Sequence, residues 1–214
     1  TKDNNFTWKD YQDRNNNELL AVFGNFVNRT LVLTHKYFEG KVPALTNLNE
    51  KDNAAIEEMN QYPDKIAHLL DTYKFREALS ELMKLARLGN RYLTEDEPWK
   101  QFKTDPERVK TVLALSMQIV AKLAILSEPF LPFSAKKLQA MIGLKVSGWN
   151  QAKETVLLNE NATIGEVELL FTKVEDETVA AQVNKLEETK KQNELNAWAP
   201  NPIKPNTNID EFGK

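Results

Sequence analysis

The most constraining feature of this sequence is the stretch Pro106–Leu126, which reads PERVKTVLALSMQIVAKLAIL. Its apolar residues recur on almost every side of a helix with about 3.6 residues per turn, not on one face alone. A helix of this kind is stable in water only when other elements surround it. The stretch therefore predicts the most buried helix of a helical bundle.

Two further segments, 8–38 and 74–93, carry apolar residues at the spacing of one helix face, and two more are also expected to be helical. With the first stretch, the expected helices cover residues 8–38, 50–73, 74–93, 106–126 and 134–142. A polar run near Asn15 can interrupt the first, Pro63 should kink or split the second, and Ser134 is the expected N-cap of the last. Glycines number only 7, and strong helix formers dominate. The expected fold class is all-α, a bundle of about five main helices.

The character of the sequence changes after Gly143. Short irregular or extended pieces follow, then an amphipathic helix over residues 176–193, and finally a Pro- and Asn-rich end. Composition of that last kind seldom buries enough apolar surface to become ordered. We expect three parts: a helical bundle over residues 1–143, a C-terminal extension over 144–193 that packs on or near the bundle, and a flexible linker over 194–214.

Charge and cysteine content limit the function classes. The formal net charge is −3, whereas proteins that bind nucleic acid through a general field are basic, so DNA is not an expected partner and RNA would need local, shaped contacts. With no Cys, a thiolate zinc site and a cysteine nucleophile are excluded. We find no apolar run of the roughly 20 residues that a membrane span needs and no signal-peptide pattern. No membrane partner and a cytoplasmic location are expected.

The search for a catalytic or metal site is largely negative. His35 and His68 each fall within an expected helix, without a second histidine at zinc-binding spacing. The sequence shows no Gly-rich phosphate loop and no nucleophile elbow. The carboxylates have Lys and Arg neighbours, which favours solvated helix faces with ion pairs between successive turns. No catalytic residue, metal or cofactor is predicted for this chain.

Three side chains remain as candidates for recognition. Asn25 and Arg29 are four residues apart on the first expected helix, away from the centre of its apolar stripe, so they should be exposed side by side. An amide beside a guanidinium offers the donors and acceptor that complement a base edge. Trp99 follows Pro98 in a charged turn after the third expected helix, where a base could stack on its ring.

Each of these residues also has a purely structural explanation. Arg29 could pair with an acidic neighbour, Asn25 could be an arbitrary polar choice, and Trp99 is more often a half-buried staple against a bundle than a stacking platform. Asn90 falls on an apolar stripe, which indicates a structural residue bonded to the turn that follows it. From spacing alone the structural explanations are favoured, and the chain would be a soluble helical bundle.

Three blocks of the sequence carry a resemblance that changes this balance. The blocks NNNELLAVFGNFVNRTLVLTHKYFEGKVP, LARLGNRYLTEDEPWK and AILSEPFLPFSAKKLQAMIG together resemble the anticodon-binding domain of methionyl-tRNA synthetases, which are class I enzymes. The match covers residues 6–143, and GNFVNR and NRYLTEDEPW are its specific part. The family's recognition Asn and Arg fall on Asn25 and Arg29, its stacking Trp on Trp99 and the supporting Pro on Pro98. Thr94 departs from the acidic residue of many relatives.

The resemblance implies that the chain reads the CAU anticodon of methionine tRNAs, initiator and elongator alike. The family's ATP-binding motifs and Cys-rich zinc knob do not occur here, so it implies a fragment that is inactive alone and holds no cofactor. ATP, Mg²⁺ and Zn²⁺ would belong to the full-length methionine–tRNA ligase, whose catalytic domain would be a partner within the same chain. The segment IKPNTNIDEFGK resembles a linker towards a further C-terminal tRNA-binding module.

Two alternatives stay open. The chain could be a helical protein-interaction module that binds no RNA. It could also be the anticodon domain of a sister class I synthetase, which the NFVNR and EPW blocks fit less well.

Overall fold

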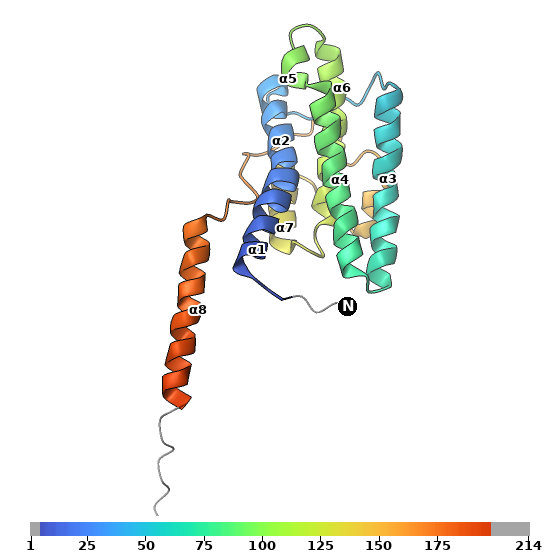
Figure 1. Cartoon of the computed structure of the whole chain (residues 1–214). Coiled ribbons are helices and arrows are strands. Elements are labelled where there is room, and N and C mark those ends of the chain that lie inside the picture. The colour runs from blue at the N-terminus through green and yellow to red at the C-terminus, as the bar shows by residue number, and fades with distance from the viewer. Residues whose placement is uncertain (1–4, 198–214) are drawn as a thin grey trace, which may run out of the picture. The chain divides into compact units, whose positions relative to one another are not determined.

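A computed structural model describes residues 5–197 of the chain. These residues form two compact units, one over Asp13–Lys173 and one from residues 5–12 together with 174–197. The larger unit holds the helical bundle (Figure 1).

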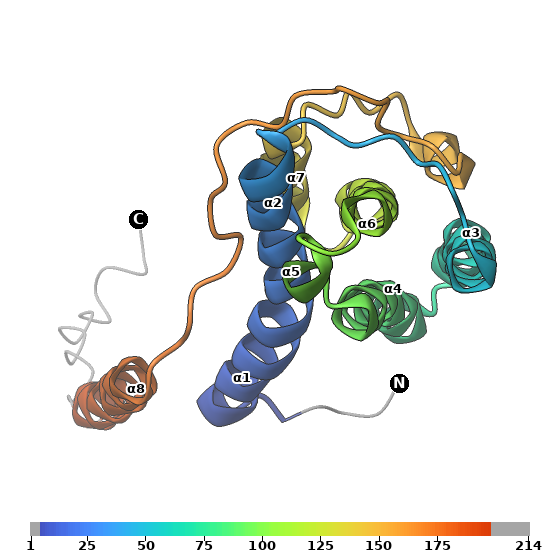
Figure 2. The same cartoon turned by 90° about the horizontal axis from the view of Figure 1, so that it is seen from above.

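The larger unit confirms an all-α bundle. Its elements are the end of α1 (Trp8–Arg14), the π-helix η1 (Asn15–Gly24), α2 (Asn25–Phe38), α3 (Glu50–Asp71), α4 (Phe75–Asp96), α5 (Pro98–Gln101), α6 (Pro106–Leu126), α7 (Pro132–Met141) and the 3-10 helix η2 (Trp149–Lys153). Seen from above, α6 stands in the middle of α2, α3, α4 and α7 (Figure 2). Every residue from Thr111 to Leu126 is buried, as the apolar pattern predicted.

The apolar content of α6 corrects one expectation from the sequence. By length and composition this helix could cross a membrane, contrary to the expectation that no segment would meet that test. Nearly all of its apolar window is buried inside the bundle. The apolar side chains of α6 pack against the surrounding helices, as expected for the core helix of a bundle.

Local capping explains where several helices begin. The Asp105 side chain accepts a hydrogen bond from the Arg108 amide at 3.0 Å, and Pro106 occupies the first turn of α6. At the start of α3, Asn49 and Asp52 each accept from the other's backbone amide, at 3.0 and 2.9 Å. The expected cap at Ser134 is wrong, because α7 begins two residues earlier with Pro132 in its first turn and no side-chain cap.

The first expected helix is continuous but not uniform. Its geometry changes from α to π at Asn15 and returns to α at Asn25, whose amide donates to the Leu20 carbonyl five residues before it. The second expected helix is not split, since α3 runs unbroken through the buried Pro63.

Residues 144–173 form an irregular strap over the bundle. The strap contains the short helix η2 but no strand. A single bridge pairs its Thr163 with Lys41 of the bundle. The Trp149 indole donates to the Pro63 carbonyl at 3.2 Å. From α6, the Gln118 amide donates to the Leu158 carbonyl at 2.8 Å. Hydrogen bonds to two bundle helices, α3 and α6, thus hold the strap in place.

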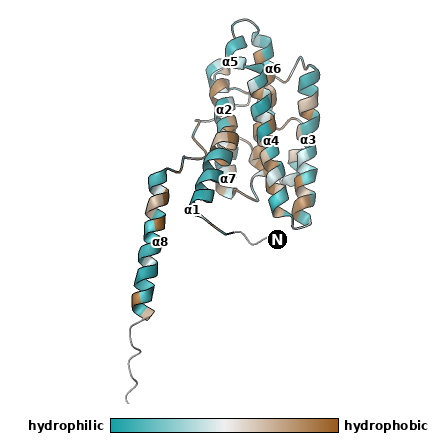
Figure 3. Ribbon diagram, viewed as in Figure 1, coloured by the Kyte–Doolittle hydropathy of each residue, from teal (hydrophilic) through white to brown (hydrophobic). Residues whose placement is uncertain are grey.

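The smaller unit is built around α8 (Asp176–Ala197). The Gln12 amide donates to the Val174 carbonyl at 3.0 Å and to Asp176 at 2.8 Å. No described side chain of α8 is buried, and hydrophilic colour dominates the helix in Figure 3. The helix includes residues 194–197, which the sequence assigned to the linker. The remainder of that predicted linker, residues 198–214, lies outside the described residues.

Candidate nucleic-acid interface

Arg29 and Trp99 are brought together although 69 residues separate them. The Arg29 guanidinium carbon lies 4.7 Å from the centroid of the Trp99 ring, and one of its nitrogens donates to the Thr94 hydroxyl at 3.3 Å. Trp99 is 36% exposed, whereas Pro98 beside it is buried. The ring is therefore on the surface, and its proline is the residue that packs into the protein.

The chain turns sharply just before this tryptophan. Helix α4 ends at Asp96, and Glu97 adopts a left-handed conformation with φ of 40°. Pro98 then begins the short helix α5, so Trp99 stands in a helical turn, not in an open loop. After α5, the Phe102 ring stacks on Tyr37 of α2, with centroids 4.1 Å apart. The position of Trp99 is thus fixed by the buried Pro98 before it and by the stacked Phe102 after it.

Asn25 lies one helical turn before Arg29 on α2 and is exposed. The amide of Asn25 has no side-chain hydrogen bond to any residue in the range 5–197. Within the same range, no carboxylate lies at ion-pair distance from Arg29, so the alternative of an acidic neighbour is not what the structure shows. Both side chains keep polar groups available for a ligand.

Asn90 has a structural role, but its partner differs from the one expected. Its amide donates to the Val22 carbonyl of η1 at 2.6 Å, not to the turn that follows α4. The neighbouring Gly89 lies against the Phe26 ring so closely that a Cβ would overlap it. These contacts hold α4 close to η1 and α2. At this spacing Arg29 of α2 reaches Thr94 of α4.

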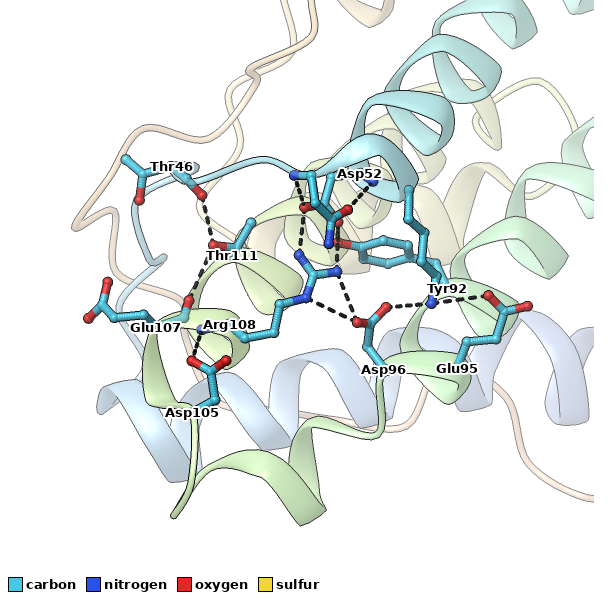
Figure 4. A network of polar contacts seen from close by, with 11 residues as sticks. Thr46, Asp52, Tyr92, Glu95, Asp96, Asp105, Glu107, Arg108 and Thr111 are labelled. Carbon is cyan, nitrogen blue, oxygen red and sulfur yellow. Dashed lines mark hydrogen bonds and ion pairs between the residues drawn. The ribbon is translucent and has the colours of Figure 1, made fainter.

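A buried ionic network supports the end of α4 next to the turn (Figure 4). Arg108 donates to both oxygens of Asp52, at 2.6 and 2.8 Å, and twice to one oxygen of Asp96, at 2.9 and 3.0 Å. Lys51 reaches the other oxygen of Asp96 at 2.7 Å, and the Tyr92 hydroxyl donates to Asp52 at 2.6 Å. The network ties the starts of α3 and α6 to the residue that precedes Glu97.

The network also shifts the ionisation of its members. Burial alone would raise the pKa of Asp52, but hydrogen bonds from Arg108, Tyr92 and the Asn49 amide outweigh it and hold that pKa below 3.8. Burial and the Asp52 carboxylate raise the pKa of Tyr92, and the bond to Asp52 raises that of Arg108. These groups therefore stay locked in one charge state at neutral pH.

The expectation of solvated carboxylates is wrong for Asp52 and Asp96, which are both buried. The Asn49-x-x-Asp52 capping pattern was a usable signal for the first. No local signal marks Asp96, because its partners come from two other helices. No group of three or more potential metal ligands occurs among residues 5–197. The exposed Asn25 amide and Trp99 indole, with the half-buried Arg29 beside them, form a surface suited to recognition by stacking and hydrogen bonding.

Comparison with known proteins identifies the family of this chain. The family model described as "Anticodon binding domain of methionyl tRNA ligase" matches residues 42–191, and "tRNA synthetases class I (M)" matches residues 1–31. The methionine–tRNA ligases of Cytophaga hutchinsonii and Phocaeicola vulgatus are 53% and 54% identical to this chain over 214 residues. These alignments cover all of this chain but 31% and 32% of the relatives, so it spans about a third of their length.

The fold is also shared with solved structures. The apo form of Mycobacterium tuberculosis methionyl-tRNA synthetase superposes with a TM-score of 0.72 at 21% identity, covering 79% of this chain and 35% of that one. Its complex with methionyl-adenylate gives 0.70 at 23% identity, over 76% and 33%. With the family model and the two relatives, these findings show that the chain belongs to the anticodon-binding domains of methionyl-tRNA ligases.

Proposed function

We propose that this chain recognises the CAU anticodon of methionine tRNAs, initiator and elongator, through Asn25, Arg29 and Trp99. The observation that carries the proposal is the Arg29 guanidinium over a Trp99 ring that stays 36% exposed. Bases of a single-stranded loop can splay out, stack on an aromatic ring and present their edges to neighbouring donors. Cytosine offers an exocyclic amine and two acceptors, a pattern that an amide and a guanidinium can meet.

In the complete protein this recognition would serve a reaction elsewhere. A methionine–tRNA ligase joins methionine to tRNA with ATP, and the chemistry would belong to a catalytic domain with its own ATP, Mg²⁺ and Zn²⁺ sites. The chain described here would contribute specificity, because its contacts form only with the right anticodon. The extension beyond residue 143 would support the bundle, and residues beyond 197 would lead towards a further module. A cytoplasmic location fits such a role.

The test is binding of methionine tRNA to the 214-residue chain, by fluorescence titration at a fixed modest salt concentration, because such affinities depend strongly on salt. We expect tighter binding to tRNA with the CAU anticodon than to a CAC variant. A good base contact is worth about 1–3 kcal/mol, which sets the size of the discrimination. Equal affinity for the two tRNAs, or none for either, would favour the protein-interaction module instead.

A further inference from the structure

A groove of about 300 Å³ lies along η1 and the start of α2, next to Asn25. One side is formed by Leu20 and Ala21 of η1 and by Asn25 and Asn28 of α2. The other side is formed by the end of the strap, with Leu169 and Phe171. All of these residues belong to the larger unit.

The groove depends on close contact between the strap and the π-helix. The Phe171 ring packs edge-on against Phe23, with centroids 5.7 Å apart. It also lies over Gly24, where a Cβ would stand 3.1 Å from the ring. With no side chain at Gly24, the strap can approach the helix backbone at the place where the two sides of the groove meet.

The lining of the groove has the character of a nucleobase site. Leu169 is 59% exposed although it is a large apolar residue, and it stands beside the partly exposed Phe171 ring. Within the part of the chain that the structure describes, the Asn25 and Asn28 amides have no side-chain hydrogen bonds. Apolar and aromatic walls with a few free polar groups at the rim are typical of small-ligand pockets, and amides can pair with base edges.

The position of the groove continues the proposed interface. Ala21, Asn25 and Arg29 follow one another at four-residue intervals, and Arg29 touches Trp99. On α2, a rise of about 1.5 Å per residue places Arg29 about 6 Å from Asn25 along the axis, and Ala21 in η1 lies on the other side of Asn25. Successive stacked nucleotides are roughly 3.4 Å apart, so the track has room for neighbouring bases of one loop.

We propose that this groove binds a second nucleobase of the anticodon loop, distinct from the base that stacks on Trp99. The proposal rests on the function proposed above and extends it to a site that the strap completes. The base enters between Leu169 and Ala21, its flat face meets the apolar wall, and the amides of Asn25 and Asn28 meet its edge.

The test fills the groove without touching the core. Ala21 is exposed, so Ala21→Leu adds bulk inside the groove and keeps a good helix former. Ala140→Leu makes the same change on an exposed position of α7 and is the matched control. The probe is an RNA hairpin whose loop carries CAU, together with hairpins in which each loop base in turn is replaced by an abasic residue. Thermal unfolding confirms that the variants are folded.

We expect Ala21→Leu to weaken hairpin binding about tenfold, the usual effect of losing one base contact, and Ala140→Leu to leave it unchanged. At one loop position, removal of the base should weaken binding to the parent chain about tenfold but should not change binding to Ala21→Leu, because the groove of that variant no longer holds the base. A different loop position should behave in the same way with Trp99→Ala, because that variant no longer stacks on the base there.

Three outcomes decide the matter. If the parent chain discriminates CAU and Trp99→Ala weakens binding, but Ala21→Leu binds as the parent does, the groove proposal is wrong and the proposed function stands. If Ala21→Leu loses affinity equally with every abasic hairpin, the groove holds no base and the proposal is again overturned. If the parent chain fails to discriminate CAU, the proposed function is wrong and the groove proposal goes with it.

Discussion

The Arg29 guanidinium covers one face of the Trp99 indole, 4.7 Å from its centroid. A cation over an indole face contributes about 0.5–1 kcal/mol at an exposed site. The arginine therefore has a defined place before any ligand arrives, and less conformational entropy is lost on binding. Since the two side chains touch, effects of substituting them will not add.

Trp99→Ala should weaken tRNA binding more than it weakens the fold. One base–aromatic stack is worth about 1–3 kcal/mol, and an exposed ring has less packing to lose than a buried Trp, whose truncation costs roughly 3–5 kcal/mol. The measurement is tRNA affinity and thermal midpoint on the same variant. Met59→Ala is the control: Met59 is fully buried in α3 and outside the proposed interface, so its truncation should lower the midpoint and leave the folded fraction's affinity unchanged. The reverse pattern would make Trp99 a structural staple.

Arg29→Lys should lose most of the discrimination between CAU and a variant anticodon, as Arg29→Ala should. Lysine keeps the charge but lacks the planar fork that stacks on an indole and meets a base edge at two points. The expected loss is about 1–3 kcal/mol, measured as the ratio of affinities for the two tRNAs. Arg91→Lys, at an exposed arginine paired with Glu58 at 2.9 Å, should change neither affinity. If Arg29→Lys keeps the parent ratio, Arg29 contributes only charge.

Gly89→Ala should destabilise the bundle although alanine is the better helix former. The propensity gain is roughly 1 kcal/mol, but the new methyl group would overlap the fully buried Phe26 ring. Overpacking of this kind costs about 1–3 kcal/mol, and we expect it to outweigh the propensity gain because the Phe26 ring is fully buried in the core. Urea unfolding measures the change. In a Phe26→Leu background the same substitution should cost less; an equal cost in both backgrounds would exclude the overlap as its cause.

Asp52→Asn should destabilise the chain and remove part of its acid sensitivity. Breaking a buried ion pair costs about 3–5 kcal/mol. The pKa of Asp52 lies below 3.8 in the folded state, so its stabilising contribution is complete above that pH and disappears as the pH falls through the lower folded value. Urea unfolding from about pH 5 to pH 2 should show a smaller loss of stability in the variant. Parallel curves would mean that Asp52 does not drive acid unfolding.

Lys122→Met should remove a rise in stability on the alkaline side. Lys122 is fully buried and donates to the Ala152 and Glu154 carbonyls of the strap, at 2.6 and 2.7 Å. Burial lowers the pKa of its ammonium group from 10.5 to about 8, partly opposed by the charge of Glu154. Between these values the unfolded chain binds more protons, so stability rises with pH.

The measurement for Lys122 is the unfolding free energy of parent and variant between pH 8 and 10.5, the window set by the two pKa values. The parent should gain stability over this window relative to Lys122→Met. The variant should be less stable at every pH, because two strap carbonyls lose their donor. Equal slopes for the two proteins would show that Lys122 keeps an ordinary pKa.

Helices with strong local signals were predictable. The bounds of α6 are the ones expected from its apolar pattern, Pro106 and Leu126. The π geometry of η1 was not predictable, because its apolar residues also fit an α-helix. Pro63 was expected to interrupt α3, yet the helix continues through it in the buried interior.

The candidate site also has a part that was predictable from the sequence and a part that was not. The four-residue spacing of Asn25 and Arg29 predicts that they project together, which is a property of one helix. The contact of Arg29 with Thr94 and Trp99 joins residues 65 and more positions apart, and no local pattern contains it. The Asp52–Arg108 pair was missed for the same reason, since its members are 56 residues apart.

Several of the bonds that attach the strap to the bundle join residues that are distant in sequence. Gln118 is 40 residues from Leu158, and Trp149 is 86 residues from Pro63. Closing long loops has an entropic cost that must be met before such bonds form, whereas α3 and α4 are joined by residues 72–74 alone. We therefore expect the strap to join last during folding and to leave first during partial unfolding. A chain at that stage would already present Arg29 beside Trp99, but the wall formed by Leu169 and Phe171 would still be missing.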